Sequence, residues 1–148
     1  MMLKIKVKSF DELTKHELYD VLQLRSAVFV VEQDCVYQDM DGKDKKALHV
    51  LGFKETRLVA YTRIFKSGIY FKEASIGRVV VAKNQRHHKF GYDIMEASIK
   101  AIKKHYNETL IKISAQCYLK NFYNNIGFRE VGQEYLEDGI PHIGMIKE

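Results

Sequence analysis

The feature that most constrains the fold is a β-branched run that leads through a basic segment directly into a helical pattern. Residues 75–82 contain three consecutive valines, a density of apolar side chains typical of a central strand. Residues 83–89 are polar, and after them the apolar residues recur at three- and four-residue spacing. A buried strand followed by an amphipathic helix implies a sheet with a helix packed on it. The sequence therefore predicts a fold that combines helices and a sheet.

Hydrophobic periodicity also predicts the other elements and their order. Thr14 and Glu17 form a capping-box pattern at the start of a helix that continues to Phe29, and residues 34–46 are predicted as a polar loop. The chain shows no repeat, linker or shift in composition. The prediction is a single α+β domain over 1–148, a mixed and mostly antiparallel sheet covered by helices. Its order is β-α-β-β-β-α-β-α-β-β, with strands over 3–7, 47–54, 58–66, 75–82, 110–115, 128–136 and 142–146, and with later helices after 89 and over 118–125.

Composition excludes several classes of protein. The chain has 148 residues, 46% of them hydrophobic and 29% charged, with a single proline, which excludes a disordered or collagen-like chain. No apolar run reaches the roughly 18 residues that span a bilayer, and residues 1–10 lack the apolar block of a signal peptide. We therefore expect a cytoplasmic protein that does not enter a membrane. Its two cysteines, Cys35 and Cys117, are predicted as free thiols.

The basic segment has the properties of an anion-binding site. The backbone N–H groups at a helix N-terminus are unpaired and sit at the positive end of the helix dipole. Gly91 permits close approach of a ligand to this backbone, so a pyrophosphate fits here. A solvated basic helix start is the plainer alternative. The net charge of +5 suits an anionic partner, but the lysines are scattered and do not favour nucleic acid. Four side chains add donors at the same place, namely Arg86, His87, His88 and Lys89.

Three blocks of the sequence resemble one family. Residues 86–91 are similar to motif A of the GCN5-related N-acetyltransferases (GNAT), with Lys89 at the place of the first motif glycine. Residues 116–128 resemble motif B, which ends Phe-Tyr-x-x-x-Gly-Phe. Residues 24–39 and 138–145 together resemble the ElaA-type branch of the family.

The resemblance implies a GNAT acyltransferase fold, a twisted sheet splayed between its fourth and fifth strands. It also implies transfer of an acetyl group from acetyl-CoA to an amine, by direct attack in a ternary complex. The backbone of residues 79–81 would pair with pantetheine, and the N–H of Val80 or Val81 would polarise the thioester carbonyl. The implied cofactor-binding residues are Val79, Val80, Val81, Arg86, His87, His88, Lys89, Phe90, Gly91, Tyr92, Gln116 and Asn121.

The resemblance implies one residue as the catalytic acid but leaves several candidates for the catalytic base. Tyr123 occupies the position whose phenol protonates the departing CoA thiolate, and its alternative is an ordinary core tyrosine. Histone-type relatives carry a catalytic Glu where this chain has Ser75, and Glu73 has the same strand parity. His142, Glu32 or a chain of water could serve as the base instead. The catalytic candidates are therefore Tyr123, Glu73 and His142.

The acceptor side is expected to involve Glu32, Tyr37, Arg78 and His142. A carboxylate such as Glu32 would attract a cationic amine, and a salt bridge to Arg25 or Arg78 is its alternative role. The expected acceptor is a small-molecule or peptide amine. No metal site is expected, since His87-His88 matches no zinc-ligand spacing. A homodimer stays open.

Two other functions stay open at this level. A non-catalytic acyl-CoA-binding or sensing module would share the fold. An acyl-homoserine-lactone-synthase-like enzyme is suggested by a loose similarity in the segment that runs from Arg25 through Phe29 to Glu32.

Overall fold

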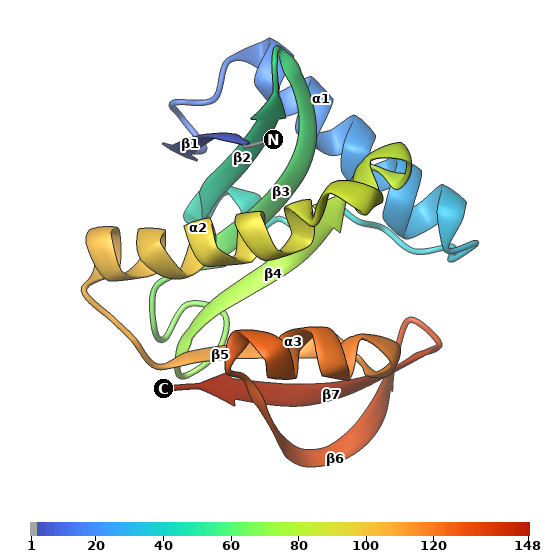
Figure 1. Cartoon of the computed structure of the whole chain (residues 1–148), viewed down its shortest axis with the longest axis vertical. Coiled ribbons are helices and arrows are strands. Elements are labelled where there is room, and N and C mark those ends of the chain that lie inside the picture. Colours follow the sequence, from blue (N-terminus) through green and yellow to red (C-terminus); the bar gives the residue numbers. More distant parts are fainter. Residues whose placement is uncertain (1–2) are drawn as a thin grey trace.

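The computed structural model describes residues 3–148 and forms a seven-stranded sheet with the strand order β1-β2-β3-β4-β5-β7-β6. Met1 and Met2, part of the segment considered above for a signal peptide, lie outside the described residues. The order of elements is the predicted one (Figure 1). The strands are β1 (Lys4–Ser9), β2 (Leu48–Lys54), β3 (Arg57–Phe65), β4 (Ala74–Val81), β5 (Ile111–Gln116), β6 (Arg129–Glu137) and β7 (Ile140–Lys147), and the α-helices are α1 (Lys15–Arg25), α2 (Phe90–Tyr106) and α3 (Lys120–Ile126).

The sheet opens between β4 and β5, as the resemblance implies. These two strands run parallel and form the register pairs Ala74–Ile111 and Ser75–Lys112. Every other neighbouring pair in the sheet is antiparallel. Beyond Ser75 the strands separate, so the β5-facing edge of β4 has no strand partner among the described residues. Figure 1 shows the two halves of the sheet diverging at this point.

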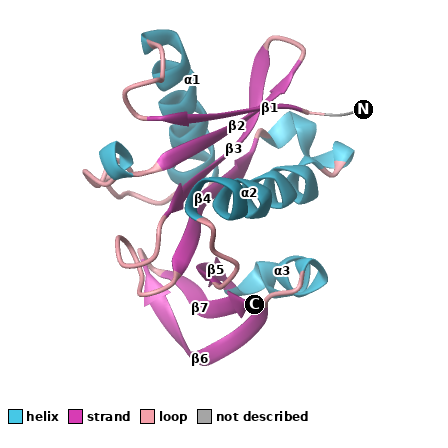
Figure 2. Ribbon diagram, turned by 90° about the vertical axis from the view of Figure 1, so that its left-hand side faces the viewer, coloured by secondary structure: helices cyan, strands magenta, loops and turns pink. Residues whose placement is uncertain are grey.

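Helices cover both faces of the sheet and create two cores. In Figure 2 α1 lies on one side of β2–β4, and α2 lies on the other side together with α3. The larger core lies on the α2 side and includes Phe90, Ile94 and Ile102, all fully buried. The smaller core lies beneath α1 and includes Val21 and Tyr61. None of the helices in residues 3–148 is long and apolar enough to cross a membrane.

The first helix begins where the capping box predicts but ends differently. Thr14 accepts a hydrogen bond from the Glu17 N–H at 3.0 Å, and the Glu17 carboxylate accepts one from the Thr14 N–H at 2.9 Å. After Arg25 the chain continues in a wider π-helical turn over Ser26–Glu32. π-Helical turns are often found at functional sites. This one carries the chain three residues beyond the predicted end, to Glu32.

Candidate active site

A cleft of about 490 Å³ lies where β4 leaves β5. Its volume is within the range usual for ligand pockets, roughly 300–1,000 Å³. The residues that line it belong to the π-helical turn, β4, the start of α2, β5, α3 and the β6–β7 turn. The structure thereby brings together most of the residues predicted from sequence, namely Glu32, Tyr37, Arg78, Val79, Val80, Val81, Arg86, Lys89, Gly91, Tyr92, Gln116, Tyr123 and His142.

Five of the predicted site residues do not line this cleft. Glu73 lies in the bend before β4, at the end where β4 still pairs with β5, and so away from the open end. The Phe90 side chain is fully buried in the larger core. The rings of His87 and His88 pack on each other with centroids 3.8 Å apart, and Asn121 is exposed on α3. The side chains of these five residues therefore cannot contact a ligand bound in the cleft as it stands.

A β-bulge interrupts β4 at the mouth of the cleft. The register passes from the pair Arg63–Gly77 to the pair Tyr61–Val80, so two residues of β4 stand opposite one residue of β3. The first bulged residue, Arg78, has φ +49°, which is strained for a residue other than glycine. Bulges disrupt the ladder locally and bend the strand. The bulge therefore marks the place where the backbone of β4 turns away from regular pairing and borders the cleft.

The segment before α2 offers backbone donors, as predicted. A 3₁₀ turn spans Lys83–His88, Lys89 adopts a left-handed conformation with φ +62°, and no side chain caps the start of α2. The uncapped N–H groups remain available to an anion. Gly91 has a second role here, because a Cβ atom at this position would come within 3.2 Å of the Phe122 ring. The glycine thus allows α2 to pack closely against α3 beside the cleft.

Glu32 and Arg86 form a two-pronged ion pair across the cleft lining. The two Nη atoms of Arg86 donate to the Glu32 carboxylate at 2.6 and 2.7 Å, and Nε donates to the Val81 carbonyl at 3.2 Å. The hydrogen bond from Arg86 lowers the pKa of Glu32. The sequence-based alternative was a salt bridge from Glu32 to Arg25 or Arg78. It is wrong, because the partner of Glu32 is Arg86. Both of those arginines bind aspartates instead.

Tyr123 combines burial with access to the cleft. Its side chain is 5% exposed and packs edge-on against Phe122 and Phe128, with ring centroids 5.0 and 6.1 Å away. Burial raises the pKa of the Tyr123 phenol well above its ordinary value. The phenol therefore stays protonated at neutral pH and can donate to a group in the cleft.

His142, on β7, lines the cleft with both ring nitrogens engaged. Its Nδ1 lies 2.7 Å from the Ile140 carbonyl oxygen, and because a carbonyl only accepts, Nδ1 carries the proton. Nε2 lies 3.4 Å from the Glu137 carboxylate. The ring stacks on Tyr135, with an interplanar angle of 24°. A proton taken up at Nε2 would lie beside a negative charge.

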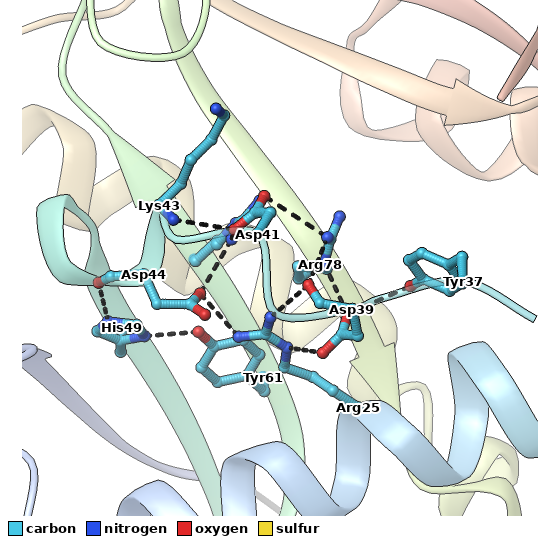
Figure 3. Close-up of polar contacts among 10 residues, drawn as sticks. Arg25, Tyr37, Asp39, Asp41, Lys43, Asp44, His49, Tyr61 and Arg78 are labelled. Atoms are coloured by element: carbon cyan, nitrogen blue, oxygen red, sulfur yellow. Dashed lines mark hydrogen bonds and ion pairs between the residues drawn. The ribbon is translucent and has the colours of Figure 1, made fainter. Parts of the chain in front are cut away.

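A buried ion network lies beside the cleft and was not foreseen from sequence. It ties the loop 34–46 to α1, β3 and β4, as Figure 3 shows. Arg25 is inaccessible to solvent and Arg63 is 1% exposed, so both charges depend on their partners. The network contains equal numbers of positive and negative side chains, Arg25, Arg63 and Arg78 with Asp39, Asp41 and Asp44.

Two aspartates bridge the three arginines. Asp44 accepts hydrogen bonds from Arg25 at 2.8 Å and Arg63 at 2.9 Å. Asp39 accepts one from Arg25 at 2.8 Å and also lies 2.8 Å from Arg78 Nε. The strained bulge at Arg78 is therefore held by the same network that fixes the loop. Arg63 and Arg78 interrupt apolar strands and four aspartates lie in the loop 34–46, which indicates charged groups in both places but not which of them pair.

Two contacts join the segment after the π-helical turn to the far side of the cleft. The side-chain amides of Gln33 and Gln116 pair at 3.2 and 3.4 Å, although sequence analysis assigned Gln116 only to the cofactor. The thiol of Cys35 donates to the Asp138 carbonyl at 3.2 Å. Residues 33–35 therefore cross from the α1 side to β5 and to the β6–β7 turn. Gln33, Cys35, Glu137 and Asp138 all line the cleft and were missed by sequence reasoning.

No cluster of three or more histidine, cysteine or acidic side chains suited to a metal ion occurs within residues 3–148. The cleft thus offers backbone donors, a protonated phenol, an imidazole and several charged pairs. These groups suit acid–base and electrostatic chemistry.

Comparison with known proteins supports the same interpretation. In sequence, the chain is 46% identical to Protein ElaA of Escherichia coli over 139 residues, which is 93% of this chain and 91% of that protein. In structure, it matches the crystal structure of E. coli ElaA with a TM-score of 0.91, covering 99% of this chain and all of the other. An acyl-CoA N-acyltransferase from Pseudomonas aeruginosa also matches with a TM-score of 0.91, at 38% identity and over 99% and 100% of the two chains.

A more distant structure shows the same fold with a ligand. An aminoglycoside 6'-N-acetyltransferase complexed with coenzyme A matches with a TM-score of 0.71 at 15% identity, over 96% of each chain. The model of the acetyltransferase (GNAT) domain matches residues 12–148, nearly the whole length. With the sheet opened between β4 and β5 and the uncapped start of α2 beside it, the chain belongs to the GNAT acetyltransferase family and to its ElaA-type branch.

Proposed function

We propose that the protein is an N-acetyltransferase that moves an acetyl group from acetyl-CoA to an amine by direct attack within a ternary complex. The observation that carries this proposal is the separation of β4 from β5 next to the uncapped N-terminus of α2. An extended pantetheine chain can pair with a free strand edge, and a pyrophosphate can bind a helix N-terminus. Residues of both features line the same cleft, which supports the binding of one ligand by both.

In the proposed complex, the backbone of residues 79–81 pairs with the pantetheine arm. The start of α2 and Lys89 take the pyrophosphate, with Tyr92 beside it. Of the two predicted donors, Val81 is the one whose N–H points away from β3, because the Ala82 N–H bonds to the Val59 carbonyl and the direction alternates along the strand. This N–H donates to the thioester carbonyl oxygen. A fixed donor placed where an oxyanion develops contributes about 3 kcal/mol to transition-state stabilisation.

The chemical step needs one base and one acid. The amine nitrogen attacks the thioester carbon, the tetrahedral intermediate collapses, and the carbon–sulfur bond breaks. The thiolate takes its proton from Tyr123, whose phenol lines the cleft and is protonated at neutral pH. The amine loses its proton to His142 Nε2, directly or through water, and the Glu137 carboxylate lies 3.4 Å from that nitrogen. Glu73 is not assigned a role, because it does not line the cleft.

Titration calorimetry with acetyl-CoA, CoA and pantetheine tests the donor site. We expect micromolar binding of both nucleotides, and pantetheine should bind at least tenfold more weakly, about 1.4 kcal/mol, because it lacks the pyrophosphate. Equal affinity for CoA and pantetheine would contradict the assignment of the α2 N-terminus.

A screen of amines, read by thiol release, tests the reaction itself. The panel spans polyamines, aminoglycosides, amino acids and peptide N-termini. Release of CoA that depends on the amine, with formation of the N-acetyl product, supports the proposal. Tight acetyl-CoA binding without release on any amine would indicate a binding or sensing module. Turnover restricted to an acyl-carrier protein with a methyl-sulfonium cosubstrate would indicate a lactone-synthase-like enzyme.

A further inference from the structure

The Glu32–Arg86 pair joins two parts of the cleft that serve different substrates in the proposed reaction. Glu32 ends the π-helical turn after α1, and Arg86 lies in the turn that leads into α2. Both side chains line the cleft, and both remain partly accessible, 26% for Glu32 and 42% for Arg86. The pair is therefore within reach of an incoming ligand.

Three of the five N–H donors of Arg86 are committed in this arrangement. Both Nη atoms donate to Glu32, at 2.6 and 2.7 Å, and Nε donates to the Val81 carbonyl. The planar guanidinium binds carboxylates and phosphates through the same paired N–H groups. Arg86 cannot give this pair of donors to Glu32 and to a pyrophosphate at the same time. A pyrophosphate that takes this same pair of donors therefore displaces the Glu32 carboxylate.

The backbone that carries Glu32 is held in place by its chain neighbours. Gln33 bonds to Gln116 on β5, and Cys35 bonds to the Asp138 carbonyl at the β6–β7 turn. Neither contact involves Arg86. If the guanidinium turns toward a phosphate, the backbone of Glu32 therefore stays at the wall of the cleft. Lys83 is the other cation that acts on Glu32, and it makes no ion pair with it.

We propose that the CoA pyrophosphate and Glu32 compete for Arg86, so that donor binding releases the Glu32 carboxylate to receive the ammonium group of the acceptor. This inference rests on the proposed function and adds an order to it. Before the donor binds, the carboxylate is neutralised and attracts an amine weakly. After the donor binds, the carboxylate is free. Thermodynamic linkage then requires that the amine strengthens CoA binding by the same factor by which CoA strengthens amine binding.

A double-mutant cycle on CoA affinity tests the competition without any acceptor. Glu32→Gln should bind CoA about threefold more tightly by calorimetry, since Arg86 no longer has to be withdrawn from a carboxylate, and the gain is limited by the partial exposure of the pair. Arg86→Gln should bind CoA about tenfold more weakly. With Gln at position 86, the Glu32→Gln gain should vanish. Glu96→Gln is the matched control, because it changes the net charge equally and breaks the exposed Glu96–Lys100 pair outside the cleft.

Three outcomes of the cycle contradict the inference. Unchanged affinity in Glu32→Gln means that the pair does not compete with the ligand. A gain that persists in the Arg86→Gln background, or that also occurs in Glu96→Gln, reduces the effect to general charge repulsion. If the wild-type chain binds no CoA at all, the proposed function fails first and this inference fails with it.

The release of the carboxylate has its own readout. In protein labelled with ¹³C-glutamate, saturating CoA should shift the Glu32 carboxyl resonance, assigned by its loss in Glu32→Gln. Propylammonium, used as the amine probe, should then shift that resonance only in the CoA-bound protein. A resonance that does not respond to CoA, or that responds equally to propylammonium with and without CoA, overturns the proposal.

Discussion

The two halves of the cleft are built in different ways. The half proposed to bind the donor (the donor half), from β4 to the start of α2, depends on the backbone: a free strand edge, a β-bulge and an uncapped helix N-terminus. The half proposed to bind the acceptor (the acceptor half) depends on side chains that come from distant segments, since the loop 34–46 is held by arginines of α1, β3 and β4. In the donor half the strand, the basic turn and the start of α2 follow one another in sequence, whereas the acceptor half is assembled only in the complete fold.

This difference has a chemical reason. A backbone site recognises the invariant part of a substrate, here the pantetheine and pyrophosphate of CoA in the proposed reaction. A site made of side chains on a loop can change without disturbing the sheet. The buried network limits this freedom, because any change in the loop has to keep the charges of Arg25 and Arg63 balanced.

Asp44→Asn should break the acceptor half and give the largest effect. Its carboxylate pairs with Arg25 and Arg63 at 2.8 and 2.9 Å, and the amide would leave two buried guanidinium groups short of negative charge. Removal of one partner from a buried ion pair costs about 3–5 kcal/mol. Urea unfolding followed by circular dichroism should show a loss of this size.

Asp20→Asn is the control for this variant, because Asp20 is exposed on α1 and makes no ion pair within the described chain. Its unfolding free energy should stay within about 0.5 kcal/mol of the wild type. The folded fraction of Asp44→Asn should still bind CoA with nearly wild-type affinity, since the donor half is built from backbone groups. Equal stability of the two variants would show that the network does not support the loop.

The same contrast explains how far the sequence could be interpreted. The order of elements followed from periodicity, and the capping box at Thr14 and Glu17 appears as predicted. The start of α2 was recognisable because strand, basic turn and helix are contiguous. The network was not, because Arg25, Arg63 and Arg78 meet the aspartates only after three elements pack together. Glu32 was placed on the acceptor side, and its bond to Arg86 depends on two segments 54 residues apart.

Tyr123→Phe should have the next largest effect and acts where the two halves meet. We expect CoA affinity to stay unchanged and kcat to fall about 100-fold, or 2.7 kcal/mol, the lower range for loss of a general acid. The effect stays at that level because a thiolate is a fair leaving group without help. Calorimetry and steady-state kinetics with an amine from the screen measure the two quantities.

Tyr118→Phe makes the same chemical change at a second phenol of the cleft lining, which is 73% exposed and not buried like Tyr123. It should retain wild-type turnover. If Tyr118→Phe instead loses activity and Tyr123→Phe retains it, the assignment of the acid has to be exchanged between the two.

Lowering the pH should destabilise the protein through the buried ion network of the acceptor half. Burial alone would raise the pKa of Asp41 and of Asp44, but the hydrogen bonds and charges of their arginine partners outweigh it, so both pKa values lie below the usual range. A carboxyl group whose pKa is lowered in the folded state stabilises the fold above its unfolded value, about 3.9, and loses that contribution as the pH falls through the folded value. The unfolding free energy should therefore decline as the pH falls from about 5 toward 3.

Asp41→Asn removes one of these carboxyl groups and should make the decline shallower than in the wild type. Urea unfolding at several pH values measures both slopes. Parallel slopes would show that Asp41 does not contribute to the acid sensitivity. The expected difference is smaller than the effect of Asp44→Asn, because Asp41 is the more exposed of the two.

Lys89→Gly should give the smallest effect, and it concerns the backbone of the donor half. Lys89 has φ +62° and ψ +27°, a left-handed conformation that costs a residue with a Cβ atom about 1–2 kcal/mol. Glycine removes this strain but loses more entropy on folding, about 0.5–1 kcal/mol, so we expect a net stabilisation of about 0.5–1 kcal/mol. The same substitution removes a cation from the cleft lining and should weaken CoA binding about threefold.

Asn107→Gly, at the left-handed residue that ends α2 with φ +55°, is the matched control. Asparagine tolerates this conformation better than lysine, so the control should gain less stability and leave CoA affinity unchanged. A gain in unfolding free energy together with a loss of CoA affinity in Lys89→Gly would show that two requirements conflict at this position. Glycine fits the backbone conformation better, and lysine binds the ligand better. A loss of stability would instead mean that the Lys89 side chain holds the start of α2 in place.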